Sequence, residues 1–216
     1  MEREVDIELI SDGKRYLSND LVKLECEECK GCSDCCKDMG DSILLDPYDV
    51  FCLTVHLERS FESFIDQEIV LGVINQVILP HFKMCGEQSG CSFLSEEGRC
   101  RIHGIRPGFC RLFPLGRIYE NDSFSYFYQN TACTKGGKSK IKIKKWLGIS
   151  NLSAYEAFIL SWHDLLKEIQ DKGTQLGFEW QSAHNVKMLQ LFFQLPYDGN
   201  RDFYEQYYER LNQYER

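Results

Sequence analysis

The sequence predicts an α+β fold with a loop-rich, cysteine-rich body, a small antiparallel hairpin, and mainly helical flanks and C-terminus. Three observations support this prediction. Eleven cysteines among 216 residues gather on a few short stretches. Short apolar runs separated by turn residues occupy the middle of the chain, and apolar residues at helical spacing follow residue 153.

The first predicted elements are two helices that follow residue 45. Asp46-Pro47 starts the first one, because Asp is a favoured N-cap and Pro is tolerated at the first helical position. The stripe of this helix continues through Val50, Leu53, Thr54 and Leu57. Ser60 is predicted to cap the second helix, which carries Phe61, Phe64 and Ile65.

Strands are predicted in the middle of the chain. β-branched residues within 69–84 indicate one or two short strands. Residues 117–128 are typical of a β-hairpin, because Arg117-Ile118-Tyr119 and the aromatic run 124–128 flank the turn residues Asn121-Asp122.

The C-terminal part is predicted to be helical. Ser153-x-x-Glu156 fits a capping box, apolar residues then recur at helical spacing, and Gly173 is expected just past the end of this helix. A second helix is predicted at 186–194. A third runs from about residue 201 to the C-terminus, with one side formed by Tyr204, Tyr207, Tyr208 and Leu211. We expect a cysteine-rich domain at 1–149 and a helical segment at 150–216 packed on it as one compact unit.

The densest group of thiols is Cys26-x-x-Cys29-x-x-Cys32-x-x-Cys35-Cys36. Such a run is typical of soft metal ligands, which suit zinc or an iron–sulfur cluster. Its first, second, third and fifth cysteines match the spacing of a bacterial ferredoxin run, although Lys37 stands in place of the Pro. Adjacent side chains on extended backbone point to opposite sides. Cys35 and Cys36 therefore either serve two metals or divide between ligation and packing.

A second group combines three cysteines with a characteristic order of glycine, arginine, proline and aromatic residues. It reads Cys91-Ser-Phe-Leu-Ser-Glu-Glu-Gly98-Arg-Cys100-Arg-Ile-His103-Gly-Ile-Arg106-Pro107-Gly-Phe-Cys110-Arg111-Leu-Phe113-Pro114. Together with the first group, the intervening stretch 45–50 and the late Cys133, this order resembles the YkgJ-type cysteine-cluster family over roughly residues 25–135. That family is a zinc- or iron-chelating domain, so the resemblance implies a protein that binds a metal ion or cluster.

The resemblance also implies a set of ligands. By the family pattern, the eight metal-ligating cysteines are Cys29, Cys32, Cys35, Cys36, Cys91, Cys100, Cys110 and Cys133. The implied cofactor is an iron–sulfur cluster of the 4Fe-4S type, or zinc. Three further cysteines lie outside the pattern. We interpret Cys52, on the first predicted helix, as a buried thiol, whereas ligation and packing are weighted equally for Cys26 and Cys85.

Three charged or polar residues of the second group have predicted roles beside the metal. His103 is favoured as a neighbour of the ligands rather than a ligand, because the family alternates His with Tyr there and Tyr is a poor zinc ligand. Arg106 and Arg111 bracket Cys110. We expect their guanidinium groups to offset thiolate charge, with surface salt bridges as the alternative.

Charge and hydropathy exclude some partners. The formal net charge of −8 argues against nucleic acid. No apolar signal region follows Met1 and no apolar run is long enough to span a bilayer, so we expect no membrane partner and a cytoplasmic location. The lysine-rich stretch 135–146 is a local exception. Its Lys-Ile-Lys-Ile alternation favours a half-buried strand with a solvated lysine face over contact with an acidic partner or a phosphate.

These features leave two classes of function open. The first is a metal-binding module whose iron–sulfur or zinc centre has a structural, redox or accessory role. The second is an enzyme that resembles AdoMet-dependent protein lysine methyltransferases, because flagellin lysine-N-methylases are distantly similar to the same family. A domain that binds only zinc, in a structural role, is a further alternative. Between the two kinds of centre, iron–sulfur is preferred.

Overall fold

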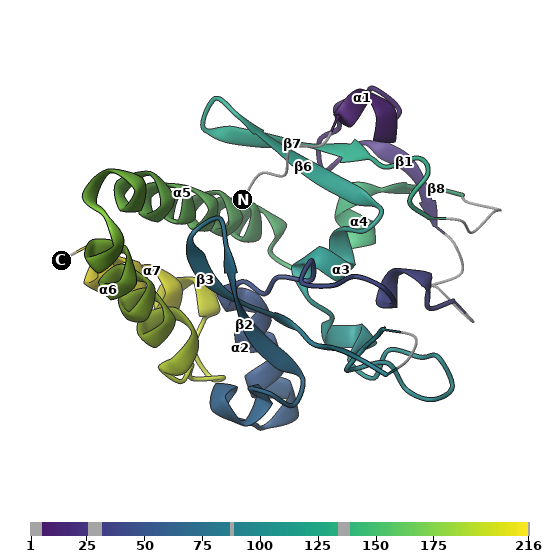
Figure 1. Ribbon diagram of the computed structural model, residues 1–216. Coiled ribbons are helices and arrows are strands. Elements are labelled where there is room, and N and C mark those ends of the chain that lie inside the picture. Colours follow the sequence, from purple (N-terminus) through teal and green to yellow (C-terminus); the bar gives the residue numbers. More distant parts are fainter. Residues whose placement is uncertain (1–5, 26–31, 87–88, 134–138, 216) are drawn as a thin grey trace.

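The fold is α+β, as predicted. The computed structural model describes residues 6–25, 32–86, 89–133 and 139–215 (Figure 1). Within these residues the strands form two-stranded antiparallel sheets, in the pairs β1–β8, β2–β3, β4–β5 and β6–β7. None of the described helices combines the length and the apolar character that a membrane crossing requires.

The first predicted helix is confirmed as α2 (Pro47–Leu57). The side chain of Asp46 accepts the N–H of Asp49 at 2.9 Å, and Asp49 in turn accepts the N–H of Asp46 at 3.1 Å, so the two form a reciprocal capping box. The second predicted helix is only a 3-10 turn, η3 (Phe61–Phe64). Ser60 stands at its N-cap position but makes no capping hydrogen bond through its side chain.

Two hairpins form where strands were predicted. β2 (Ile69–Ile74) pairs with β3 (Val77–Phe82), and β6 (Leu115–Glu120) pairs with β7 (Ser123–Tyr128). Both tips are two-residue turns whose residues have positive φ. Paired left-handed conformations match the twist of a hairpin, and asparagine tolerates them better than most residues.

Two further strand pairs are short. β1 (Leu21–Glu25), which was not predicted, pairs with β8 (Ser139–Lys142), and β4 (Met84–Cys85) pairs with β5 (Gly90–Cys91). The prediction for the lysine-rich stretch is confirmed at 139–142, where Lys140 and Lys142 are exposed and Ile141 between them is half-buried. It is wrong from Ile143 onward, where the chain is helical, and residues 135–138 lie outside the described residues. The short helices α1 (Ile7–Ile10) and α4 (Ile143–Leu147) flank this sheet in the chain.

The long helix α5 (Leu152–Leu176) differs from its prediction at both ends. Its N-cap is Asn151, which accepts the N–H of Ala154, so the predicted capping box at Ser153 is wrong. The earlier start lets Leu152 pack on the core. Gly173 lies inside the helix rather than past its end. A Cβ there would come within 2.7 Å of the side chain of Gln181, so glycine provides room for the next helix.

The last two helices also differ in detail. α6 (Phe178–Leu189) begins earlier than predicted and continues into a π-helical turn, η5 (Gln190–Gln194). The sequence did not predict this earlier start, because the first turns of α6 have no buried apolar stripe. Phe178, their first apolar residue, is 83% exposed. α7 (Phe203–Tyr214) buries Phe203, Tyr207 and Tyr214, whereas Tyr208, which was predicted on the same side as Tyr207, is 38% exposed.

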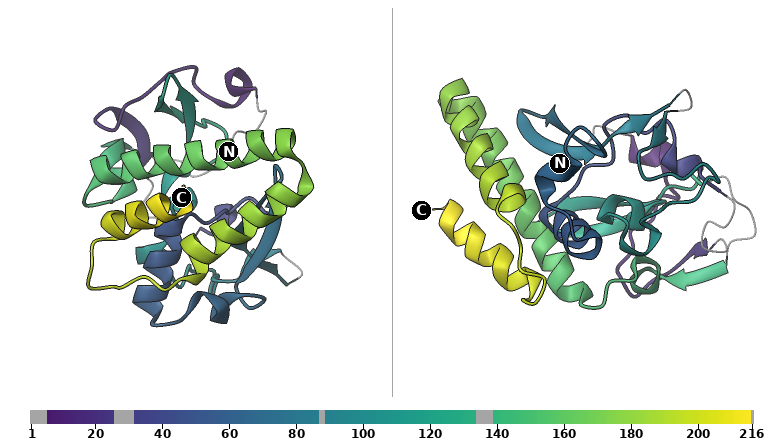
Figure 2. Two further views of the ribbon diagram at one scale, coloured as in Figure 1. Left: turned by 90° about the vertical axis from the view of Figure 1, so that its left-hand side faces the viewer. Right: turned by 90° about the horizontal axis from the view of Figure 1, so that it is seen from below.

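Aromatic packing joins the C-terminal helices to the rest of the chain. Phe158 of α5 makes edge-on contacts with Phe203 and Tyr207 of α7, with ring centroids 5.1 and 4.7 Å apart. Tyr48 of α2 contacts Phe203 and Tyr155 in the same way. Figure 2 shows α5, α6 and α7 together at one end of the molecule, with β8 at the opposite end.

Candidate metal centre

Cys35 and Cys36 lie in a single 3-10 turn, η2 (Asp34–Cys36). The N–H of Cys36 donates to the carbonyl of Ser33 at 2.9 Å. Immediately after the turn, Lys37 forms an antiparallel bridge with Gly90. This bridge brings the first cysteine group against the strand β5, which contains Cys91.

Cys91 and Cys100 lie at the two ends of a tight loop. The N–H of Leu94 donates to the carbonyl of Cys91 at 2.8 Å, and Leu94 forms an isolated bridge with Cys100. Gly98 turns the chain with a φ of +71°, a conformation that favours glycine. The loop therefore brings Cys100 back close to Cys91.

Cys110 lies on the short helix α3 (Gly108–Leu112), which is anchored to α2. The N–H of Gly108 donates to Oδ1 of Asp49 at 2.7 Å. Position 108 also has no room for a side chain, because a Cβ would lie 2.3 Å from the hydroxyl of Tyr155. The capping box of α2 and the close approach of α5 thus fix where Cys110 stands.

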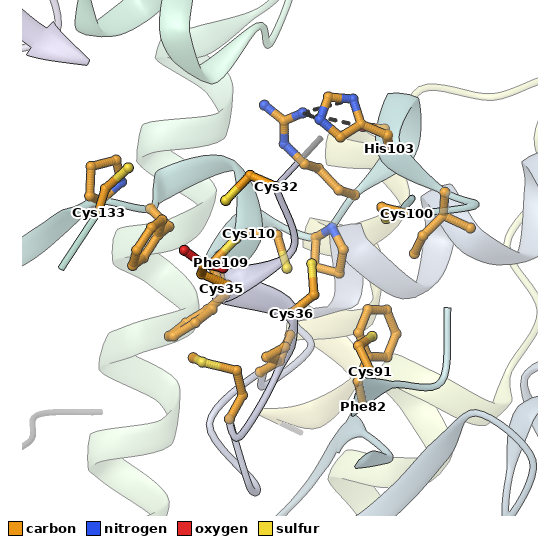
Figure 3. Close-up of a pocket in the computed structure, with 18 of the residues that line it drawn as sticks. Cys32, Cys35, Cys36, Phe82, Cys91, Cys100, His103, Phe109, Cys110 and Cys133 are labelled. Atoms are coloured by element: carbon orange, nitrogen blue, oxygen red, sulfur yellow. Dashed lines mark hydrogen bonds between the residues drawn. The ribbon is translucent and has the colours of Figure 1, made fainter. Parts of the chain in front are cut away.

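These segments bring seven of the eight predicted ligands around one cavity of about 160 Å³. The lining cysteines are Cys32, Cys35, Cys36, Cys91, Cys100, Cys110 and Cys133. Figure 3 shows Cys36 and Cys110 toward the middle, with Cys91 beside Phe82 and Cys133 on the other side of the view. The eighth, Cys29, lies outside the described residues. The assignment of these cysteines as ligands stays a prediction.

The thiols surround the cavity rather than meet at one point. Among the residues that the structure describes, no three His, Cys, Asp or Glu side chains stand in an arrangement that could hold a single metal ion. The rest of the wall is largely apolar and aromatic, with Phe109, Phe113 and Trp146 among its members. Such a wall limits water access to whatever the thiols bind.

Burial and hydrogen bonding set the protonation of the thiols. A hydrogen bond between the side chains of Cys35 and Cys36 lowers the pKa of Cys35 to about 7 and raises the pKa of Cys36. Burial raises the pKa values of Cys91, Cys100 and Cys110, with Cys110 shifted well above its ordinary value. Cys35 is therefore the thiolate that forms most readily among these five groups.

The two arginines near Cys110 have different surroundings. Arg106 lines the cavity, and its Nη1 lies 2.7 Å from Nε2 of His103. Burial raises the pKa of Cys100, and the positive charge of Arg106 opposes that rise. Arg111 instead donates to backbone carbonyls, at 2.8 Å to both Gly104 and Arg106. Arg111 thus joins neighbouring backbone segments, which neither of its predicted roles included.

Cys52 and Cys85 do not line the cavity. Cys52 is 8% exposed on α2, in keeping with its interpretation as a buried thiol. Cys85 is exposed at the end of β4. Cys26 lies outside the described residues. The sequence interpretation missed Asp49 as an anchor for α3, because its place as the N3 acid of a capping box marks the start of α2 and not a bond to Gly108.

Comparison with known families agrees with this geometry. Residues 28–134 match the model of the CxxCxxCC family, which is described as a "putative zinc- or iron-chelating domain". This part of the chain belongs to that family. No curated protein and no solved structure matches the chain. The matched range contains all eight cysteines of the family pattern and the whole wall of the cavity except Trp146.

Proposed function

We propose that the protein holds a cysteine-ligated iron–sulfur cluster, of the 4Fe-4S type, with a structural, redox or accessory role. The observation that carries the proposal is the gathering of seven family cysteines from separate parts of the chain around one cavity. Its ligands would be drawn from Cys29, Cys32, Cys35, Cys36, Cys91, Cys100, Cys110 and Cys133.

One property of the cavity favours a cluster over a single zinc ion, and two others fit either centre. Seven of the lining side chains are thiols, which both centres accept. The described thiols surround a volume instead of converging on one point, which suits a centre larger than one ion. The Arg106 guanidinium supplies positive charge beside the thiolates. Zinc alone, in a structural site, is the alternative.

The test is to quantify iron, zinc and acid-labile sulfide in protein purified without oxygen. We expect iron and sulfide in equal amounts and a brown colour. Cys36→Ser and Cys110→Ser should lose most of the iron. Cys85→Ser, whose thiol is exposed and does not line the cavity, is the matched control and should keep the iron. Zinc without sulfide would establish the alternative, and protein without either metal would refute both.

A methyltransferase activity like that of flagellin lysine-N-methylases is a separate proposal. The cytoplasmic location is another. A reducing compartment suits a site that needs thiolates, because oxidised cysteines cannot ligate. Binding of S-adenosylmethionine by the metal-loaded protein, measured by calorimetry, tests the enzyme interpretation. A titration without heat would remove the interpretation and leave the metal proposal standing.

A further inference from the structure

The outer face of the β1–β8 sheet presents a cluster of lysines. The register places Lys23 opposite Lys140 and Leu21 opposite Lys142. Residues directly opposite in an antiparallel pair share one face of the sheet. Val22, which lies between the two β1 residues, is buried, so their side chains point outward. We call Leu21, Lys23, Lys140 and Lys142 the lysine face.

The lysine face is unfavourable for the sheet itself. Like charges directly opposite each other destabilise a strand pair, and Lys23 and Lys140 are such a pair. All three lysines are exposed. None of the salt bridges among the described residues pairs these lysines with an acid, so the sheet presents a cluster of lysines in a protein whose net charge is −8.

Apolar side chains lie among these charges. Leu21 is 54% exposed, and Leu17, just before the strand, is 65% exposed. The acid of this loop, Asp20, accepts the backbone N–H of Leu17 at 2.7 Å. Protein–protein interfaces combine apolar contacts with polar and charged side chains, so exposed leucines beside these lysines are compatible with one.

The lysine face continues toward the cysteine cavity through α4. The N–H of Lys144 donates to the carbonyl of Ser18 at 2.8 Å, which holds α4 against the loop before β1. Lys144 and Lys145 are exposed, while the next residue, Trp146, lines the cavity. Figure 1 shows α4 between the β1–β8 sheet and α3. A partner on the lysine face would thus lie next to the candidate metal centre.

We propose that the lysine face, with Lys144 and Lys145, is a docking surface for an acidic segment of a partner protein. Positive charge concentrated on one side of an acidic molecule orients an anionic partner before contact. The exposed leucines match an apolar contact that a protein segment can supply.

The test uses the full chain and two labelled peptides. One repeats glutamate and leucine, and the other contains the same number of glutamates without leucine. We expect the glutamate–leucine peptide to bind more tightly, with an affinity that falls as salt rises. The double variant Lys140→Glu/Lys142→Glu should weaken binding of both peptides about tenfold. Leu21→Ser should remove the advantage of the glutamate–leucine peptide.

The matched control is Lys167→Glu/Lys172→Glu, which changes the net charge equally on exposed positions of α5. It should leave binding within about twofold, since α5, which carries both lysines, lies away from the β1–β8 sheet (Figure 1). An equal loss in the control would overturn the proposal, and so would tighter binding of a single-stranded RNA or of phosphatidylserine vesicles. Metal content, measured in every variant, should stay at the wild-type level, so failure of this proposal is distinct from failure of the metal site.

Discussion

The carboxylate of Asp49 joins two helices that are far apart in the sequence. One oxygen accepts the N–H of Gly108, the first residue of α3, and the other accepts the N–H of Asp46 at the start of α2. Asp49 is only 4% exposed, so water does not replace these bonds. The position of Cys110 therefore depends on a side chain that belongs to none of the cysteine motifs.

Replacing Asp49 with alanine should destabilise the protein. The N–H of Gly108 would remain buried without an acceptor and the part-buried N–H of Asp46 would lose its acceptor too. Leaving a buried donor unpaired costs about 1–3 kcal/mol. Denaturant unfolding of the metal-loaded protein measures the effect. Asp171→Ala, at an exposed position of α5, is the control and should stay within about 0.5 kcal/mol of wild type. Equal stability of the two variants would show that the bonds from Asp49 do not hold α3.

Gly108→Ala should also destabilise the protein, because the new Cβ would meet the hydroxyl of Tyr155. Overpacking of this kind costs about 1–3 kcal/mol. Gly104→Ala is the matched control, since no atom lies within 4 Å of a Cβ there. Tyr155→Phe in the Gly108→Ala background should recover part of the loss. Thermal unfolding of the wild type, the two single variants and the double variant would show that the two substitutions are not additive. Strict additivity would contradict the proposed clash.

Metal release should increase as the pH falls from 8 to 6. Cysteines bind metal as thiolates, so protons compete with the metal for them. Burial raises the pKa of Cys110 and a hydrogen bond with Cys35 raises that of Cys36, so protons displace the metal at a higher pH than from ordinary thiols. The release is measured as transfer of metal from the protein to a chelator, with the free-metal concentration buffered to the same level at each pH. Equal release across the range would exclude these thiols as ligands.

The two cysteines of the N-terminal run that lie outside the described residues should respond differently to substitution. The family pattern includes Cys29 and omits Cys26, whereas a ferredoxin-like loop would use both. Cys26→Ser should therefore retain more metal than Cys29→Ser, as measured by metal content after purification without oxygen. The reverse order would restore the ferredoxin interpretation.

Lys140→Glu should stabilise the fold. The substitution replaces a like-charge pair with an opposite-charge pair across from Lys23, and such cross-strand pairs contribute about 0.2–1 kcal/mol. Thermal unfolding at low salt would show the gain, and high salt should reduce it. Lys142→Glu, which faces Leu21 instead, is the control and should change stability less. A lower midpoint for Lys140→Glu would contradict the register.

Local signals predicted the elements that local interactions determine. Asp46-Pro47 marked the start of α2 because its cap is made within one turn. Asn121-Asp122 marked a hairpin because both residues adopt the left-handed conformation that the turn needs. In each case the partner of the decisive residue lies a few positions away in the chain.

Elements that depend on distant partners could not be predicted in the same way. The alternation at 139–142 indicated a strand but not its pairing with β1, more than a hundred residues earlier. Gly173 suggested a helix end, yet its lack of a side chain serves the approach of Gln181. The cysteine pattern identified which thiols gather, whereas the anchoring of α3 by Asp49 became visible only in three dimensions.

The spread of the lining cysteines along the chain has a consequence for synthesis. The last of them, Cys133, follows Cys36 by almost a hundred residues, and the two line the same cavity. A nascent chain that ends before Cys133 presents thiols without a closed site. The cavity can be completed only after β6 and β7 have left the ribosome, so its closure belongs to the late stage of translation or to the finished protein.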